Sequence, residues 1–71
     1  MNLNKVKEYI QEIKNTSCKF IYKGARNQKE EFYGVIIKCF SSVFVVQTTD
    51  NVIKTFSYND FIMNNIKIIS L

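Results

Sequence analysis

The amino-acid sequence predicts a mainly β fold, a small five-stranded antiparallel barrel preceded by an N-terminal α-helix. Apolar residues recur at helical spacing near the start of the chain, and from Cys18 onward the period changes to two. Polar turn signals then separate five short segments rich in β-forming residues. The 71 residues suit one domain. We divide it into a helical part over residues 1–16 and a barrel over residues 17–71.

The helix is predicted over residues 3–15. Its apolar residues lie three or four positions apart, and they are Leu3, Val6, Ile10 and Ile13, with Tyr9 beside them. Asn2 or Asn4 can cap the first turn, because a short side-chain oxygen accepts a hydrogen bond from an unpaired backbone amide. So short a helix does not persist alone in water, so its apolar side must pack on the sheet or on a partner subunit.

The five strands are predicted over residues 18–23, 32–39, 43–48, 52–56 and 66–70. Residues 24–31 are polar and charged, which indicates a loop. Gly34 permits a bend or the close approach of another strand. The third strand has apolar residues in succession and is expected to be central in the sheet. Ser57, Tyr58 and Asp60 form a structural turn motif, in which Ser57 and Asp60 are spaced as a capping box for one helical turn.

The core is predicted from this alternation and from the large apolar side chains. We expect it to contain Ile10, Ile13, Phe20, Val35, Ile37, Phe44, Val46, Phe56, Phe61 and Ile68.

Composition narrows the class of protein. Hydrophobic residues make up 46% of the chain, which argues against disorder. Uninterrupted apolar runs are a few residues long, whereas a membrane span needs about 20. The first 14 residues lack the apolar block of a signal peptide. We therefore expect a cytoplasmic protein without membrane contact, in which Cys18 and Cys39 are reduced, buried thiols.

Catalysis is not expected. The chain has no histidine, the usual general base near neutral pH. Asp50 and Asp60 lie where turns account for them, and the adjacent Glu30 and Glu31 point apart on an extended chain. The residues available do not form a metal-ligand set, so we expect no catalytic residue, no metal and no cofactor.

Basic residues indicate a binding function. Residues 1–29 hold seven bases and two acids (net +5), and residues 30–71 hold three bases and four acids (net −1). The densest basic segment contains Lys19, Lys23, Arg26 and Lys29, and Tyr22 lies within it. An acidic protein or a nucleic acid would be attracted to this segment. Phe20, Tyr22 and Tyr33 also place rings near these cations, as in proteins that bind single strands by stacking, although such rings are needed for the core as well.

A homodimer is also expected. The chain has more large apolar residues than one small barrel can cover, and an exposed apolar cluster usually marks an interface. The residues predicted for this interface are Leu3, Tyr9, Phe40, Ile62 and Leu71.

Three motifs resemble the Veg family. Its pattern G-I-L followed by Y-P-S-V-F-V-I-Q is similar to Gly34-Val35-Ile36 and Phe40-Ser41-Ser42-Val43-Phe44-Val45-Val46-Gln47. Its S-Y-x-D-V-L signature is similar to Ser57-Tyr58-Asn59-Asp60-Phe61-Ile62, and Ile66-Lys67-Ile68 follows at the matching distance. Gly24-Ala25-Arg26 stands where the family has a Gly-Gly-Arg-Arg-Lys loop. Departures are Ser41 for Pro, Asn27 and Gln28 for basic residues, Met63 for Thr and Lys67 for an acidic residue.

The resemblance implies an SH3-like barrel without a catalytic site and a regulatory role. That role is the stimulation of biofilm formation through relief of a transcriptional repressor, so a protein partner, a transcriptional regulator, is favoured. The alternative is a resemblance to the Sm-like RNA-binding fold, which also begins with a helix. In that case the segment from Lys19 to Lys29 would bind nucleic acid.

Overall fold

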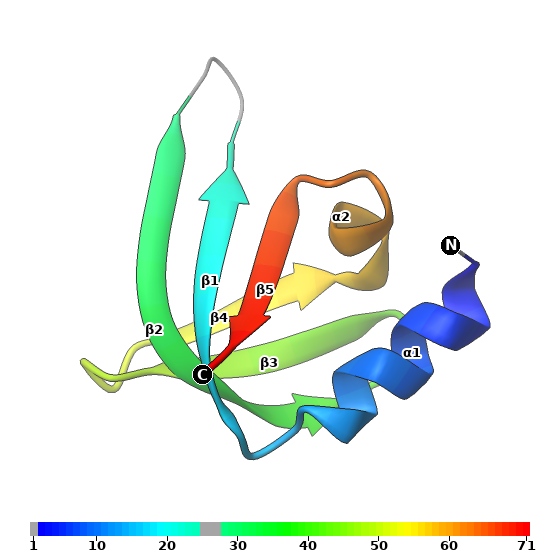
Figure 1. Cartoon of the computed structure of the whole chain (residues 1–71), viewed down its shortest axis with the longest axis horizontal. Coiled ribbons are helices and arrows are strands. Elements are labelled where there is room, and N and C mark those ends of the chain that lie inside the picture. Colours follow the sequence, from blue (N-terminus) through cyan, green and yellow to red (C-terminus); the bar gives the residue numbers. More distant parts are fainter. Residues whose placement is uncertain (1, 25–27) are drawn as a thin grey trace.

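The computed structural model describes residues 2–24 and 28–71 and confirms the predicted mainly β fold with an N-terminal helix (Figure 1). Its elements, in chain order, are α1 (Leu3–Glu12), β1 (Ser17–Lys23), β2 (Lys29–Cys39), β3 (Val43–Thr48), β4 (Ile53–Ser57), α2 (Tyr58–Ile62) and β5 (Ile66–Ser70). Neither of these helices is long and apolar enough to cross a membrane.

The five strands form one antiparallel sheet in the order β4-β3-β2-β1-β5. The sheet is curled. Two strands separate β1 from β4 in the sheet, yet the rings of Tyr22 on β1 and Phe56 on β4 lie only 5.3 Å apart. It is nevertheless open, with β4 and β5 as its edges. The chain passes from β4 to β5 through α2, which packs against both strands. The predicted barrel is therefore an open, barrel-like sheet.

Helix α1 begins at the predicted cap and ends earlier than predicted. The Asn2 side chain accepts a hydrogen bond from the backbone N–H of Lys5, at 2.9 Å. The helix stops at Glu12 because Asn15 adopts a left-handed conformation, with a φ of 66°. The N–H of Asn15 then donates to the carbonyl oxygen of Ile36, at 2.9 Å, which ties the end of the helix to β2. From this position α1 buries Val6 and Ile10 in the core.

Strand β2 begins at Lys29, three residues before the predicted start, so the prediction of a loop up to residue 31 is wrong. Residues 29–31 pair with residues 21–23 of β1. Charged side chains are compatible with a strand here because they have partners. Lys29 forms an ion pair with Glu31 at 3.5 Å, and Glu30 forms one with Lys54 of β4 at 2.8 Å.

The core follows the predicted pattern except on β2. Its buried members are Val6, Ile10, Cys18, Phe20, Ile36, Phe44, Val46, Phe56, Tyr58, Ile66 and Ile68, while Ile13 and Phe61 are partly buried against them. Val35 and Ile37 were predicted in the core, but Ile36 between them is the buried residue. The inward positions of β2 are Phe32, Gly34 and Ile36, and a bulge between Ile36 and Lys38 then shifts the register. Because Gly34 has no side chain, it gives no apolar signal for this phase.

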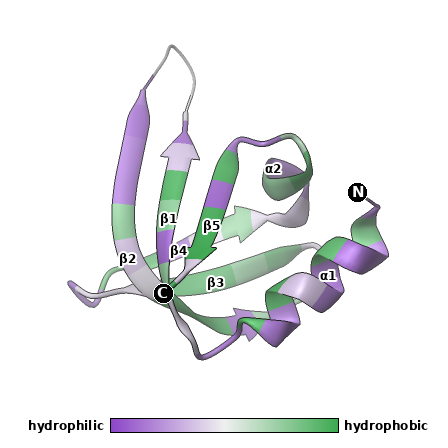
Figure 2. Cartoon of the chain, in the orientation of Figure 1, coloured by the Kyte–Doolittle hydropathy of each residue, from purple (hydrophilic) through white to green (hydrophobic). Residues whose placement is uncertain are grey.

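Strand β3 lies inside the sheet, between β4 and β2, and is hydrophobic along most of its length (Figure 2), as predicted. Its buried side chains alternate, with Phe44, Val46 and Thr48 inward and Val43, Val45 and Gln47 half-buried on the other side. The one buried polar side chain among them, Thr48, accepts a hydrogen bond from the N–H of Val52 at 3.1 Å.

Candidate interaction surface

The predicted binding residues on β1 lie on two opposite faces of the sheet. Strand alternation places Cys18, Phe20 and Tyr22 inward, and the ring of Tyr22 packs on Phe56. Lys19 and Lys23 point outward from the same strand. The sequence already indicates this arrangement, because side chains alternate along a strand and Tyr22 therefore lies on the same face as Phe20 and on the opposite face from the two lysines.

The other two basic residues that were predicted to bind a partner are Lys29 and Arg26. Lys29 lies opposite Lys23 in the β1–β2 register but is paired with Glu31. Arg26 lies outside the residues that the structure describes. In the described residues, the lysines of the basic segment therefore lie on strands and not in a loop, with Lys19 and Lys23 on β1 and Lys29 on β2.

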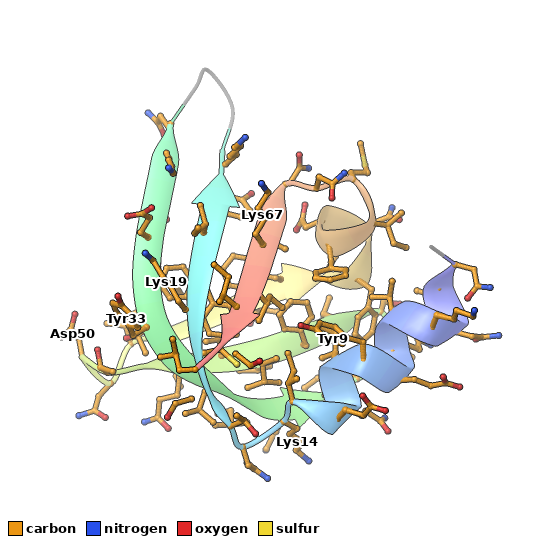
Figure 3. All side chains as sticks on the ribbon, viewed as in Figure 1. Tyr9, Lys14, Lys19, Tyr33, Asp50 and Lys67 are labelled. Atoms are coloured by element: carbon orange, nitrogen blue, oxygen red, sulfur yellow. The ribbon has the colours of Figure 1, made fainter. Side chains whose placement is uncertain are left out.

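The sheet adds further residues to Lys19 and Lys23 on the outward side of β5, β1 and β2. Lys19 lies opposite Tyr33 of β2 and opposite Ile69 of β5. Ile21 lies opposite Glu31 and opposite Lys67 in the same way. We call this surface the outer face, and its residues are Lys19, Ile21, Lys23, Glu31, Tyr33, Val35, Lys67, Ile69 and Leu71. Figure 3 shows Lys19 and Tyr33 beside each other, with Lys67 on the neighbouring strand.

Apolar side chains of the outer face are open to solvent. Tyr33 is 49% exposed, Ile69 47% and Leu71 69%, whereas the inward residues Phe20 and Ile66 are at most 1% exposed. The backbone N–H of Leu71 donates to the carbonyl oxygen of Ser17 at 3.1 Å, so Leu71 extends β5 beside the first residue of β1. Tyr33 on β2 and Ile69 and Leu71 on β5 lie on the two sides of β1. Exposed apolar groups gathered on one face are typical of protein interfaces.

The cations of the outer face are available to a partner. In residues 2–24 and 28–71, the ion pairs are Lys29–Glu31 and Lys54–Glu30, so Lys19, Lys23 and Lys67 have no carboxylate partner in that part of the chain. The Nζ atom of Lys19 lies 5.9 Å from the centre of the Tyr33 ring, a cation–π contact. Glu31, the carboxylate on this face, is neutralised by Lys29.

The turn at Ser57 has the expected capping box. The N–H of Asp60 donates to Ser57 Oγ at 3.2 Å, and the N–H of Ser57 donates to Asp60 Oδ2 at 3.4 Å. Tyr58 is buried, and its hydroxyl donates to the carbonyl oxygen of Phe40 at 2.6 Å. These bonds fasten α2 to the turn between β2 and β3. The contacts of this motif are therefore contacts within the fold.

The two cysteines are free thiols in different surroundings. Cys18 is buried and its Sγ donates to the carbonyl oxygen of Thr16 at 3.4 Å, whereas Cys39 is only partly buried, contrary to expectation. Burial raises the pKa of both thiols. For Cys39, the positive charge of Lys14 and a hydrogen bond with Tyr58 oppose this rise in pKa. Both thiols thus favour the protonated form.

The residues predicted for a dimer interface do not form one patch. Tyr9 and Ile62 pack against the core, and the Tyr9 ring lies 5.7 Å from that of Phe61. Leu3, Phe40 and Leu71 are exposed. Leu3 lies near the N-terminus and Leu71 at the C-terminus, which are well separated in Figure 1. A homodimer stays a prediction.

Comparison with known proteins supports the resemblance seen in the motifs. A comparison with curated proteins gives no match. A family model described as biofilm formation stimulator VEG matches residues 1–69. This match includes α1, β1, β2, the capping box and β5 as far as Ile69. The chain therefore belongs to the Veg family of biofilm formation stimulators.

Proposed function

We propose that this chain is a non-enzymatic, cytoplasmic binding module that regulates transcription through contact with a protein partner, a transcriptional regulator. Membership of a family of biofilm formation stimulators supports a regulatory role in biofilm formation. The contact itself is assigned to the outer face of β5, β1 and β2.

The observation that carries this proposal is a mixture, on one surface, of exposed apolar groups and of cations that have no carboxylate partner among residues 2–24 and 28–71. Lys19 is flanked on its two neighbouring strands by Tyr33 and Ile69, each about half exposed. Protein interfaces combine an aromatic and aliphatic centre with a polar rim, and complementary charges speed association and select the partner. The outer face has both components.

Nucleic-acid binding is the second candidate, and the Lys19–Tyr33 contact favours it. A cation beside an exposed ring can bind a phosphate while the ring stacks on a base. One feature weighs against it. Tyr33 is the one aromatic residue of the outer face. Single-strand binding proteins usually present several rings to successive bases.

Photo-crosslinking in growing cells tests this function. Tyr33 is replaced by the photoreactive analogue p-benzoylphenylalanine, and the matched control places the same analogue at Leu3, an exposed residue of α1. We expect irradiation to attach a defined protein other than this chain to position 33 and not to position 3. The same adduct should be lost when Lys19→Glu and Lys67→Glu are added.

Each other outcome has a clear meaning. Equal adducts from positions 33 and 3 would contradict the assignment to the outer face. Adducts at position 33 that nuclease removes and protease leaves would replace the protein partner with a nucleic acid.

A further inference from the structure

The lysines of the outer face follow a regular pattern along β1. Lys19 and Lys23 are four residues apart on this strand, which corresponds to about 13 Å. Lys67 of β5 lies opposite Ile21, midway between them. The three lysine positions therefore follow one another at intervals of about 6.6 Å along the strand direction, alternating between β1 and β5.

The same interval occurs in an extended peptide. Alternate side chains of an extended chain point to one side and recur about every 6.6 Å. Three acidic residues at alternate positions would thus meet Lys23, Lys67 and Lys19 in order. Carboxylates on neighbouring residues would not, because every second one would point away from the sheet.

An apolar contact continues this row. The next outward position of β1 after Lys19 is Ser17, which lies between Val35 of β2 and the exposed Leu71. In the extended peptide, a large apolar residue two positions beyond the last acidic residue would lie over Ser17, between Val35 and Leu71. An aliphatic side chain gains most from such a site, since it removes apolar surface of Leu71 and Val35 from water.

We propose that the partner presents an extended segment of the pattern acidic-x-acidic-x-acidic-x-apolar, which lies along β1 on the outer face. This inference rests on the proposed function and specifies the chemistry of the partner. Charge complementarity carries it, because the three lysines have no carboxylate partner in the described residues. The segment binds through side chains on the face of the sheet and does not add a strand to it, since β1 is paired on both sides.

Two peptides of equal composition test the inference on the full chain. One is Asp-Thr-Asp-Thr-Asp-Thr-Leu, and its isomer is Thr-Asp-Asp-Asp-Thr-Thr-Leu, both with blocked ends and a fluorescent label. We expect the alternating peptide to bind about fivefold to tenfold more tightly at low salt, because it forms up to two more ion pairs. A single-stranded oligonucleotide with a similar number of charges is measured beside them.

Two chain variants complete the experiment. Lys19→Glu with Lys67→Glu should abolish the preference for the alternating peptide. Lys5→Glu with Lys14→Glu alters two exposed lysines of α1 and the turn after it, and it should leave the preference unchanged. Each double variant lowers the net charge from +4 to zero, so an effect of net charge alone would change peptide binding equally in the two variants.

Other outcomes overturn the inference. Equal affinity for the two peptides, or no binding at millimolar concentration, contradicts the alternating pattern. Tighter binding of the oligonucleotide contradicts a peptide ligand. A protein adduct at position 33 together with equal peptide affinities would refute this inference alone and leave the proposed function standing.

Discussion

Replacement of Gly34 by alanine should destabilise the fold, and the structure gives the size of the effect. A methyl group at this position would lie 2.6 Å from the carbonyl oxygen of Gln47 and 3.1 Å from both the Cα of Thr48 and the Cγ1 of Val46. Ordinary contacts begin near 3.4 Å, so the two backbones would have to separate by about 0.8 Å. Strand β2 is hydrogen-bonded on both sides, to β1 and to β3, which prevents an easy shift.

Overpacking of this kind costs about 1–3 kcal/mol. A chain of this length has a total stability of roughly 4–10 kcal/mol, and each kcal/mol corresponds to about 4–8 °C in Tm. Gly34→Ala should therefore lower Tm by about 5–20 °C in thermal unfolding followed by circular dichroism. Gly24→Ala is the matched control, because its nearest neighbour would be Tyr22 Cε2 at 3.6 Å, an ordinary contact. It should leave Tm unchanged or raise it slightly. A Gly34→Ala protein that melts within about 2 °C of the parent would refute the reasoning.

Three further predictions concern the turn, the thiols and the oligomeric state. Asp60→Ala removes one side of the capping box and should cost about 0.5–2 kcal/mol in urea unfolding, whereas Asn59→Ala in the same turn should not; equal effects would contradict the role of the cap. Burial raises the pKa of the Cys18 thiol above its ordinary value of 9.0, so the folded chain holds this proton more tightly than the unfolded chain. The proton therefore stabilises the fold fully at a pH below 9.0, and this stabilisation is lost as the pH rises through the raised pKa of Cys18. Between neutral and strongly alkaline pH, the free energy of unfolding of Cys18→Ala should therefore fall less than that of the parent. For the expected homodimer, light scattering should give twice the 8.4 kDa chain mass, and a mass near 8.4 kDa would show a monomer.

The elements of this fold were predictable because their signals are local. The helix has apolar residues at helical spacing, and the strands have β-forming residues between turns. The phase of β2 was not predictable in the same way. Gly34 occupies an inward position without an apolar side chain, and the bulge after Ile36 changes the alternation partway along the strand. Its early start includes Glu30, whose ion-pair partner Lys54 lies on β4, far along the chain.

The candidate site was predictable only for the part that lies on β1. Lys19 and Lys23 are outward by simple alternation, and the same rule places Tyr22 inward. Lys67 and Ile69 come from the other end of the chain and reach these lysines through the β1–β5 register. No local pattern contains that pairing, which depends on how the last strand returns to the first.

Biofilm formation by cells that lack this protein and carry a variant of it tests the central claim most directly. The claim is that the outer face is the working surface of the chain. We expect Lys19→Glu with Lys67→Glu to fold normally and to fail to restore biofilm formation, because the charges that attract the partner are reversed. Lys5→Glu with Lys14→Glu has the same net charge and should restore it. Full restoration by the outer-face variant at equal protein level would contradict the account.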